Sequence, residues 1–379
     1  MPGFEIIDKK ERNSIIKLFD KEGGILFAHG YDKIRKKYHV REFEKQLEKK
    51  FKSSYSLAVS SGTAAIKVAL KAVGVKPGDE VITQAFNFIA TVEAILDAGA
   101  KPIICSVDEN LNMNLDDLKK KISKKTKAII PVHMLGQAVE IKKIIKIAKK
   151  KKIFVVEDNC ESVGAKYEKK YLGTLGDIGI LSFDFGKTIT TGEGGAILTN
   201  NEKFYKIAKE YHDHGHKNKK GIPRGMDIRA RVGFNYRMTE MQAVIGKVQL
   251  KKLDYIIKEN KKRYSILDSL IKKKFIIRNN ILNSEGIFDT FIFFEENKLK
   301  RNRIIKILNK NKVGTKNLPD AIKWHCSYYW GHAISAKEIK NSKSTKRLLE
   351  NSIAIPMLLS KSISIYEKIA KEIVNLSER

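Results

Sequence analysis

Residues 55–84, YSLAVSSGTAAIKVALKAVGVKPGDEVITQ, decide the fold class of this chain. They begin with a short apolar run, YSLAVS, which is typical of a buried strand. In the stretch that follows, Ile66 and Leu70 recur at helical spacing, and Gly74 is placed to end the helix. The next apolar run, DEVITQ (79–84), again favours a strand. A strand, a helix and a second strand in this order predict an α/β layer structure with a mostly parallel sheet.

The same alternation continues to about residue 200. Further strands are expected at KPIICSV (101–107), KAIIPVH (127–133) and KIFVVED (152–158). The last of these ends in Glu157 and Asp158, and strand ends are where open α/β sheets place their ligands. Beyond residue 250, Lys, Ile and Asn dominate, and short strands mix with amphipathic helices. We therefore predict a large α/β domain of residues 1–250, which includes the N-terminal segment, and a smaller C-terminal α+β domain of residues 251–379.

The chain of 379 residues has a formal net charge of +31, and 61 of its 74 basic residues are lysines. A strongly basic surface attracts polyanions such as nucleic acids. The lysines are spread along the chain, however, in helical stretches such as IKKIIKIAKKKK (141–152), where they alternate with isoleucines suited to a core. Sequence-specific nucleic-acid binders rely on arginines and interleaved aromatic residues. We interpret the lysines as solvated helix faces and expect no nucleic-acid partner, with polyanion binding as the alternative.

The spacing of the cysteines and the hydropathy pattern both bear on where in the cell the protein is expected. Cys105, Cys160 and Cys326 lie far apart and do not have the spacing of metal ligands, so we expect reduced thiols. The first residues, MPGFEIIDKKERN, lack the apolar region of a secretory signal. No apolar stretch approaches the roughly 20 residues of a membrane helix. These features predict a soluble, cytoplasmic protein without a membrane partner.

A glycine-dense stretch, GDIGILSFDFGKTITTGEGGAILTN (176–200), carries the strongest signal for chemistry. Lys187 lies in it, directly before a tract whose glycines suit backbone packed around a phosphorylated ligand. A shielded lysine can hold the aldehyde of pyridoxal 5'-phosphate (PLP) as a Schiff base, and desolvation lowers its pKa toward the working range. A carboxylate must also keep the pyridine nitrogen of this cofactor protonated. Asp158 is the candidate for that role, and Glu157 is the alternative.

The remaining parts of a PLP site are also present. The phosphate needs hydrogen-bond donors and a helix dipole, and Gly62, Thr63 and Ala64 open a predicted helix. An aromatic face must cover the ring, and FNFIAT offers Phe86 and Phe88. Taken alone, either phenylalanine fits a position in the hydrophobic core at least as well as a position over the ring.

These motifs, together with VVEDNCESVGAKY, GTLGDIGILSF and GFNYRMTEMQAVIGKVQLKKLD, resemble those of the DegT/DnrJ/EryC/StrS sugar aminotransferases. The resemblance spans nearly the whole chain and implies the aspartate aminotransferase fold of PLP enzymes. It further implies the Schiff-base lysine at Lys187, the partner of the pyridine nitrogen at Asp158, and a ring-stacking residue at Phe88. The phosphate contacts that it implies are Thr63, Ala64 and Ser182.

The resemblance also implies partners and a mechanism. An asparagine of the neighbouring subunit reaches the phosphate in this family, and Asn235 of GFNYRM matches it, so we expect a homodimer with shared active sites. Glutamate is the expected amino donor. It displaces Lys187 from the cofactor, and the freed amine then carries a proton as general base and acid in ping-pong catalysis.

This sequence departs from the family pattern in one cofactor-binding residue. Many members have glutamine where this chain has Glu161, and a carboxylate there would repel the ring oxygen of PLP in its ionised form. Other members have histidine in place of the lysine and act as sugar dehydratases. Lys187 argues against that activity, and the presence of every catalytic residue argues against a regulatory PLP fold without turnover.

The sugar acceptor remains open between two classes. Most members aminate nucleotide-linked 4-keto or 3-keto hexoses. Two tracts, the histidine tract YHDHGHKNKKGIPRGMD (211–227) and TKNLPDAIKWHCSYYWGH (315–332), instead resemble the branch that makes 8-amino-3,8-dideoxy-manno-octulosonate for lipopolysaccharide biosynthesis. The acceptor in that branch is the corresponding 8-aldehyde, whose carboxylate Arg224 would clamp. The candidate substrate-binding residues in these tracts are His212, His214, His216, Arg224, Trp324 and His325. We expect no metal at the three histidines near residue 214, because neighbouring lysines disfavour a cation.

Overall fold

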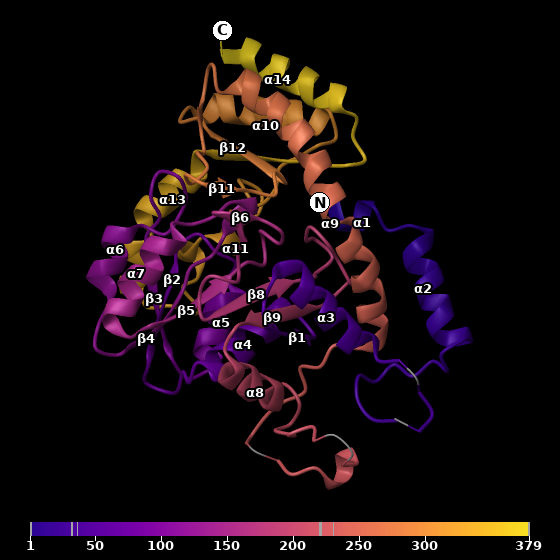
Figure 1. The fold of residues 1–379 in the computed structure, drawn as a ribbon. Coiled ribbons are helices and arrows are strands. Elements are labelled where there is room, and N and C mark those ends of the chain that lie inside the picture. Colours follow the sequence, from indigo (N-terminus) through magenta and orange to yellow (C-terminus); the bar gives the residue numbers. More distant parts are fainter. Residues whose placement is uncertain (1, 32, 36, 220–221, 230, 378–379) are drawn as a thin grey trace.

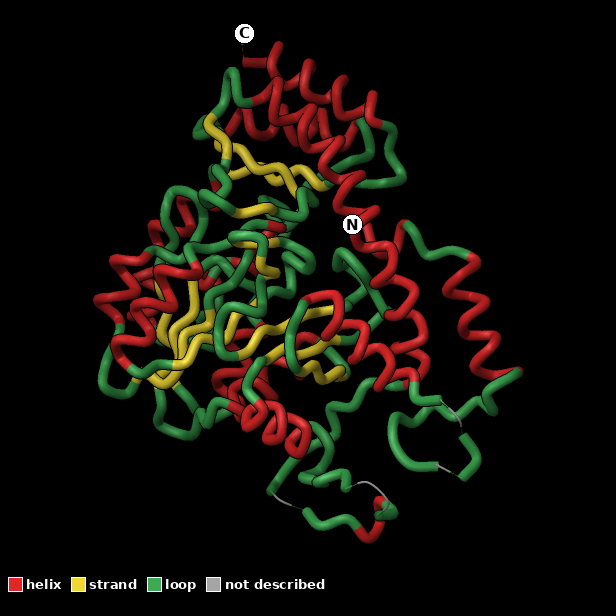
Figure 2. Tube along the Cα trace, in the orientation of Figure 1, coloured by secondary structure: helices red, strands yellow, loops and turns green. Residues whose placement is uncertain are grey.

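The computed structural model describes residues 2–31, 33–35, 37–219, 222–229 and 231–377. Its main feature is a seven-stranded sheet with the strand order β1-β9-β8-β5-β4-β2-β3 (Figures 1 and 2). These strands are β1 (Tyr55–Val59), β2 (Glu80–Gln84), β3 (Lys101–Cys105), β4 (Thr126–Ile130), β5 (Phe154–Asp158), β8 (Ile178–Ser182) and β9 (Gly195–Thr199). β9 is antiparallel to both of its neighbours, whereas the other adjacent pairs run parallel. The predicted mostly parallel sheet is confirmed.

Helices cover both faces of this sheet. They are α3 (His39–Phe51), α4 (Gly62–Ala72), α5 (Ala90–Asp97), α6 (Leu115–Lys121), α7 (Ile141–Lys151) and α8 (Glu202–Tyr211). Val59 of β1 packs in one apolar cluster with α4, while its neighbour Ala58 packs in another with Phe43 and Leu47 of α3. Because successive strand residues point to opposite faces, the two clusters are the two covered faces of an α/β sheet.

Two local expectations from the sequence are confirmed. Helix α4 ends at Ala72, and Gly74 follows with a positive φ of 79°. The amide of Gly74 donates to Lys71 and that of Val75 to Leu70, a glycine-dependent helix end. In α7 the buried residues are isoleucines and an alanine, so the lysines of that helix face solvent as the charge pattern indicates.

The C-terminal part of the chain contains a small antiparallel sheet, β10 (Ile276–Ile277), β12 (Thr290–Phe294) and β13 (Ser352–Pro356). In the apolar run KFIIRN (274–279), the strand consists of the two residues of β10. Helices α10 (Lys298–Lys310) and α14 (Ile363–Ser377) cover this sheet (Figure 1). The shorter helices here are α11 (Ile322–His325), α12 (Ala336–Asn341) and α13 (Lys343–Glu350), with 3-10 turns at Met134–Gly136, Arg224–Met226 and Ser327–Tyr329. A separate three-stranded sheet joins β6 (Lys166–Tyr167), β7 (Lys170–Tyr171) and β11 (Ser284–Glu285).

One long helix, α9 (Glu240–Ile271), connects the two parts of the chain (Figure 1). Its residue Leu253 belongs to a core of the large sheet, and Leu267 belongs to the core of the C-terminal part. The boundary predicted at residue 250 therefore lies inside a continuous helix, and the division into domains stays a prediction. The N-terminal helices α1 (Pro2–Glu5) and α2 (Lys9–Asp20) pack along α9. Within the described residues, no helix has the length and apolarity needed to cross a bilayer.

Candidate active site

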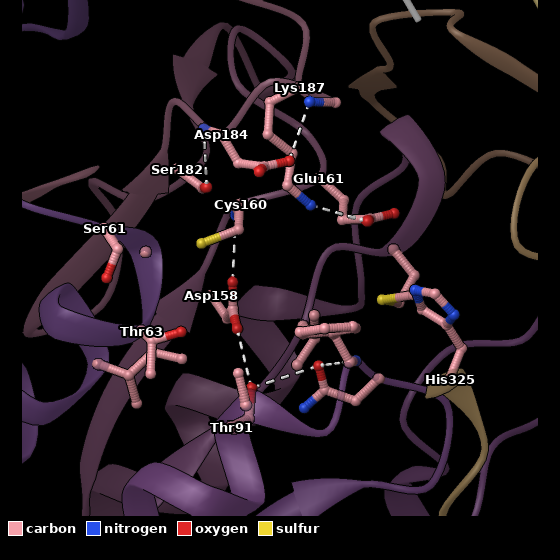
Figure 3. A pocket seen from close by; sticks show the side chains of 18 of the residues that line it. Ser61, Thr63, Thr91, Asp158, Cys160, Glu161, Ser182, Asp184, Lys187 and His325 are labelled. Atoms are coloured by element: carbon pink, nitrogen blue, oxygen red, sulfur yellow. Dashed lines mark hydrogen bonds and ion pairs between the residues drawn. The ribbon is translucent and has the colours of Figure 1, made fainter. Parts of the chain in front are cut away.

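A cavity of about 400 Å³ lies at the carboxyl ends of β5 and β8, against the start of α4 (Figure 3). Ligand sites in open α/β sheets are expected at such strand ends. The volume lies within the range of about 300–1,000 Å³ that is usual for small-molecule sites. Eight residues singled out from the sequence line it: Gly62, Thr63, Phe88, Asp158, Glu161, Ser182, Lys187 and His325.

Lys187 and Glu161 form an ion pair in this cavity, with Lys187 Nζ 2.9 Å from Glu161 Oε1 (Figure 3). Burial alone would lower the pKa of Lys187, but the attraction of Glu161 outweighs it and raises that pKa above its usual value. Burial would likewise raise the pKa of Glu161, but Lys187, with smaller effects from Lys316 and His325, holds it well below its usual value. In the protein without cofactor the lysine is therefore a charged ammonium group, and the expected lowering of its pKa is wrong for this state.

Asp158 ends β5 with its carboxylate directed into the cavity, where it is 4% exposed. Oδ2 accepts a hydrogen bond from Thr91 Oγ1 at 3.2 Å, and Oδ1 accepts one from the amide of Cys160 at 3.1 Å. These contacts fix the carboxylate without neutralising it. Thr91 was not recognised in the sequence, because a threonine in the first turn of α5 is ordinary there.

The alternative carboxylate, Glu157, points to the other face of β5 and does not line the cavity. Its oxygens accept hydrogen bonds from the amides of Gly173, Leu175 and Gly176, and from His133 Nε2 at 3.1 Å. Because adjacent strand residues alternate between faces, only one of the two acids reaches the site. The geometry therefore favours Asp158 over Glu157 as the cofactor partner.

The start of α4 forms the polar end of the cavity with Ser182. Ser61 caps the helix by accepting a hydrogen bond from the Ala64 amide at 3.0 Å, so that predicted phosphate donor already has a partner. A Cβ on Gly62 would lie 2.9 Å from Ser182 Cβ, closer than real Cβ atoms approach. Glycine at this position therefore lets the helix start approach β8. Backbone amides at a helix N-terminus beside a serine hydroxyl suit a phosphate group.

The two phenylalanines of FNFIAT have different environments. Phe86 is fully buried in a core, whereas Phe88 is 42% exposed and lines the cavity. The ring of Phe88 lies against His325 at 5.4 Å and parallel to Trp324 at 6.2 Å between centroids. Trp324 itself is 60% exposed and is not among the cavity-lining residues.

Asn317 reaches the cavity from the C-terminal part of the chain and was missed in the sequence. Its Nδ2 donates to Glu161 Oε2 at 3.3 Å. The adjacent Lys316 forms a buried ion pair with Asp289 at 2.6 Å. Nothing in the tract TKNLPD distinguishes Asn317 as a site residue, since its position depends on how the C-terminal part packs against the large sheet.

The histidine tract lies away from the Lys187 cavity. His212 and Arg224 line a second cavity of about 1,260 Å³, and neither they nor His214 and His216 line the first. His212 is buried, which lowers its pKa to about 4, and His214 is exposed. Among the described residues, no group of three or more His, Cys, Asp and Glu side chains is arranged to hold a metal ion.

Arg224 is paired within its own chain, and its role as a carboxylate clamp stays a prediction. Both terminal nitrogens of its guanidinium contact the carboxylate of Asp213, which is fully buried and also contacts Arg237 at 2.6 Å. A bidentate pair of this kind occupies the fork that would receive a substrate carboxylate. Asn235 forms a β-bridge with Asp213 and does not line the Lys187 cavity of its own chain either.

Taken together, the Lys187 cavity has the parts that PLP requires. It supplies an amine for the aldehyde, a buried carboxylate for the pyridine nitrogen, and a glycine-entered helix start for the phosphate. Phe88 supplies an exposed aromatic face at the same cavity. An amine, an acid and an anion-binding helix start in one cavity are the features expected of a PLP-dependent enzyme.

Comparisons with known proteins give the same class. A model of the DegT/DnrJ/EryC1/StrS aminotransferase family matches residues 28–373. GDP-perosamine synthase from Escherichia coli O157:H7 is 36% identical over 256 residues, which are 67% of this chain and 68% of that protein. The aminotransferase from Psychrobacter cryohalolentis superposes with a TM-score of 0.85 at 25% identity over 98% of both chains. The putative sugar aminotransferase Spr1654 from Streptococcus pneumoniae, in its PLP form, has a TM-score of 0.83 at 22% identity over 98% of this chain and 97% of that one.

This chain belongs to the DegT/DnrJ/EryC1/StrS aminotransferase family. It has the fold of the PLP-dependent aminotransferases and is a PLP-dependent sugar aminotransferase.

Proposed function

We propose that the protein moves an amino group from glutamate to a nucleotide-linked keto hexose. The observation that carries the chemistry is the placement of Lys187 and Asp158 in one cavity, with the start of α4 at its polar end. When bound, PLP supplies an electron-withdrawing ring that stabilises the carbanion formed on the substrate. Asp158 keeps the ring nitrogen protonated, and Thr91 and the Cys160 amide hold that carboxylate in place.

Lys187 has two tasks in this proposal. It holds the cofactor covalently and, once displaced by the donor, moves a proton at the substrate carbon as general base and acid. Glu161, 2.9 Å from Lys187 Nζ, holds the amine in the cavity, and Asn317 orients the second oxygen of that carboxylate. Thr63 and Ser182, both lining the cavity, bind the phosphate.

The proposal includes a homodimer, for which the position of Asn235 provides the support. Asn235 lies outside the Lys187 cavity of its own chain, on a segment with exposed apolar residues that include Val232 at 77% and Phe234 at 50% exposure. Exposed apolar clusters of this kind mark protein interfaces. A second copy packed against this segment would cover these residues and bring Asn235 to the phosphate of the partner's cofactor.

Two observations favour the nucleotide-linked acceptor over the octulosonate. The guanidinium of Arg224, proposed for recognition of the octulosonate carboxylate, already pairs with buried Asp213. GDP-perosamine synthase, a relative at 36% identity, is named for a GDP-linked amino sugar. We place the protein in the cytoplasm, where it would supply amino sugars for surface polysaccharides, lipopolysaccharide among them.

The test is a glutamate-dependent assay that compares a GDP-linked 4-keto hexose with the 8-oxo octulosonate. Formation of 2-oxoglutarate with the GDP sugar alone supports the proposal. Turnover of the octulosonate alone would overturn the choice of acceptor, and Arg224→Ala would then be expected to raise the KM for that acid. Turnover with neither sugar, despite a covalent PLP adduct at Lys187, would contradict both acceptors.

A further inference from the structure

Residues 3–6, here called the N-terminal strap, lie against the segment 185–190 that carries Lys187. Gly3 is buried, and a Cβ built on it would lie 2.6 Å from the carbonyl oxygen of Lys187 and 3.2 Å from Cα of Ile189. The strap therefore touches the backbone of the catalytic lysine directly. Only a residue without a side chain allows this approach.

The side chains of the strap make further contacts with the same segment. The ring of Phe4 stacks on Phe185, with centroids 4.7 Å apart and an interplanar angle of 17°. Ile6 packs against the apolar cluster that contains Ile189. With this stack in place, Phe185 is still 54% exposed.

A second set of contacts connects the strap to α9 and then back to the lysine segment. Lys252 Nζ donates to the carbonyl of Ile6 at 2.6 Å and pairs with Glu11 at 2.7 Å. Gln249, one turn earlier in α9, donates to Glu11 Oε1 at 2.7 Å and accepts from the amide of Thr190 at 3.4 Å. The N-terminal helices are thus connected to the Lys187 segment both directly, through the strap, and indirectly, through α9.

The strap is also bonded to the C-terminal part of the chain. Glu5 accepts hydrogen bonds from the amides of Leu359 at 2.8 Å and Ser360 at 3.3 Å, and from the Ser360 hydroxyl. The C-terminal part contributes Asn317 and His325 to the cavity. Figure 1 shows the N-terminus beside α9, where this helix passes from the large sheet to the C-terminal part.

We propose that the N-terminal strap positions Lys187: Gly3 and Phe4 hold its backbone segment against the site, and Glu5 fixes the strap to the C-terminal part. None of these three residues touches the reacting atoms, so all three are positioning residues. This inference rests on the proposed function in one respect, the role of Lys187. The contact between strap and segment is a claim about the fold and is testable without turnover.

The first experiment is hydrogen–deuterium exchange of the 379-residue protein, with and without PLP. Phe4→Ala removes the ring stack, and we expect amides of residues 185–190 to exchange several-fold faster. The matched control is Tyr55→Ala, which removes a stack of similar geometry, Tyr55 on Tyr205, with centroids 4.8 Å apart and an angle of 18°. Faster exchange of 185–190 in Phe4→Ala but not in Tyr55→Ala supports the strap, and equal exchange in the two variants overturns it.

The second experiment asks whether the strap acts through Lys187. Gly3→Ala forces the strap or the lysine backbone to move, and a misplacement of about 1 Å in a reacting group costs up to about 10²-fold in rate. We expect a fall in kcat with little change in KM for glutamate, and a shifted pH titration of the absorbance of the PLP adduct. Phe4→Tyr keeps the stack and should behave as wild type, whereas Phe4→Ala should resemble Gly3→Ala.

The two proposals fail in different ways. If kcat and the adduct's titration are unchanged in Gly3→Ala and Phe4→Ala while wild type is active, the strap is wrong and the proposed function stands. If reduction with borohydride traps no PLP adduct at Lys187 in wild type, the proposed function is wrong. The exchange experiment then still decides whether the strap holds the segment 185–190.

Discussion

Lys187 Nζ lies 2.9 Å from Glu161 Oε1, so the amine that must bind the cofactor is held by a carboxylate in its absence. The two side chains are 20% and 8% exposed, which keeps water from screening the pair as it would on the surface. The pair stabilises the ammonium form, whereas attack on an aldehyde requires the neutral amine. Cofactor binding therefore has to remove a proton from Lys187.

Lys187→Ala should abolish the covalent link to PLP. We expect a colourless variant in which borohydride traps no PLP adduct. The rate of transamination should fall by about 10²–10⁴-fold or more, since that is the usual contribution of a general acid–base group. Peptide mass spectrometry after reduction checks the adduct. Lys142→Ala removes a lysine that is 54% exposed and serves as the control. An adduct retained at another lysine in Lys187→Ala would contradict the assignment.

Glu161→Gln should lower the pKa of Lys187. Removing the opposite charge leaves burial as the dominant effect, so the pKa of Lys187 is expected to fall. The pH dependence of Lys187 labelling by an amine reagent, measured without PLP, reports this shift. Glu140→Gln breaks the exposed pair with Lys143 and should leave the Lys187 curve unchanged. An unaltered curve in Glu161→Gln would show that the pair does not control the amine.

Glu161→Gln should also change how the stability of the folded protein depends on pH. The pKa of Glu161 is lowered in the folded protein, so its contribution is present above the ordinary value of 4.5 and is lost as pH falls through the folded pKa. The pKa of Lys187 is raised, so its contribution is present below 10.5 and is lost as pH rises through the folded pKa. Thermal unfolding without PLP should show the largest loss in Glu161→Gln between these two values.

Asp158→Asn should remove catalysis with little effect on the fold. The amide keeps the shape but cannot hold a proton on the pyridine nitrogen, and a fall in kcat of about 10²–10³-fold is expected from the loss of one preorganised charge. Glu157→Gln should act differently, because its oxygens accept from three backbone amides and its loss destabilises the strand end. Steady-state kinetics and thermal unfolding separate the two results. A larger kinetic loss in a stable Glu157→Gln would reverse the assignment.

Asn235→Ala should weaken PLP binding although Asn235 does not line the cavity of its own chain. The reason is the proposed contact across a homodimer. Mixing Asn235→Ala with Lys187→Ala subunits should restore activity, because each mixed dimer then has one site with both residues intact. Mixed subunits as inactive as the separate variants, in a protein shown to be dimeric, would exclude a shared site.

The sequence by itself determined the α/β fold and the chemical parts of the site. Alternating apolar runs predicted the strands, and Gly74 and the isoleucines of α7 fixed local structure through short-range rules. Asp158 was found because it ends an expected strand and Lys187 because it lies in a glycine-dense stretch, whereas Ser182 was implied by the resemblance to the family. Local periodicity and strand-end position are properties of short segments, which a sequence displays directly.

The tertiary structure decided which of these residues meet and in what electrostatic state. Because successive side chains of β5 point to opposite faces of the sheet, Asp158 lines the cavity and Glu157 does not. Of the two phenylalanines, Phe88 lines the same cavity and Phe86 is buried in a core. The raised pKa of Lys187 depends on a carboxylate 26 residues away, and Asn317 arrives from the C-terminal part. Contacts between distant segments depend on how helices and sheet pack, because packing sets both the distances and the burial that control charge.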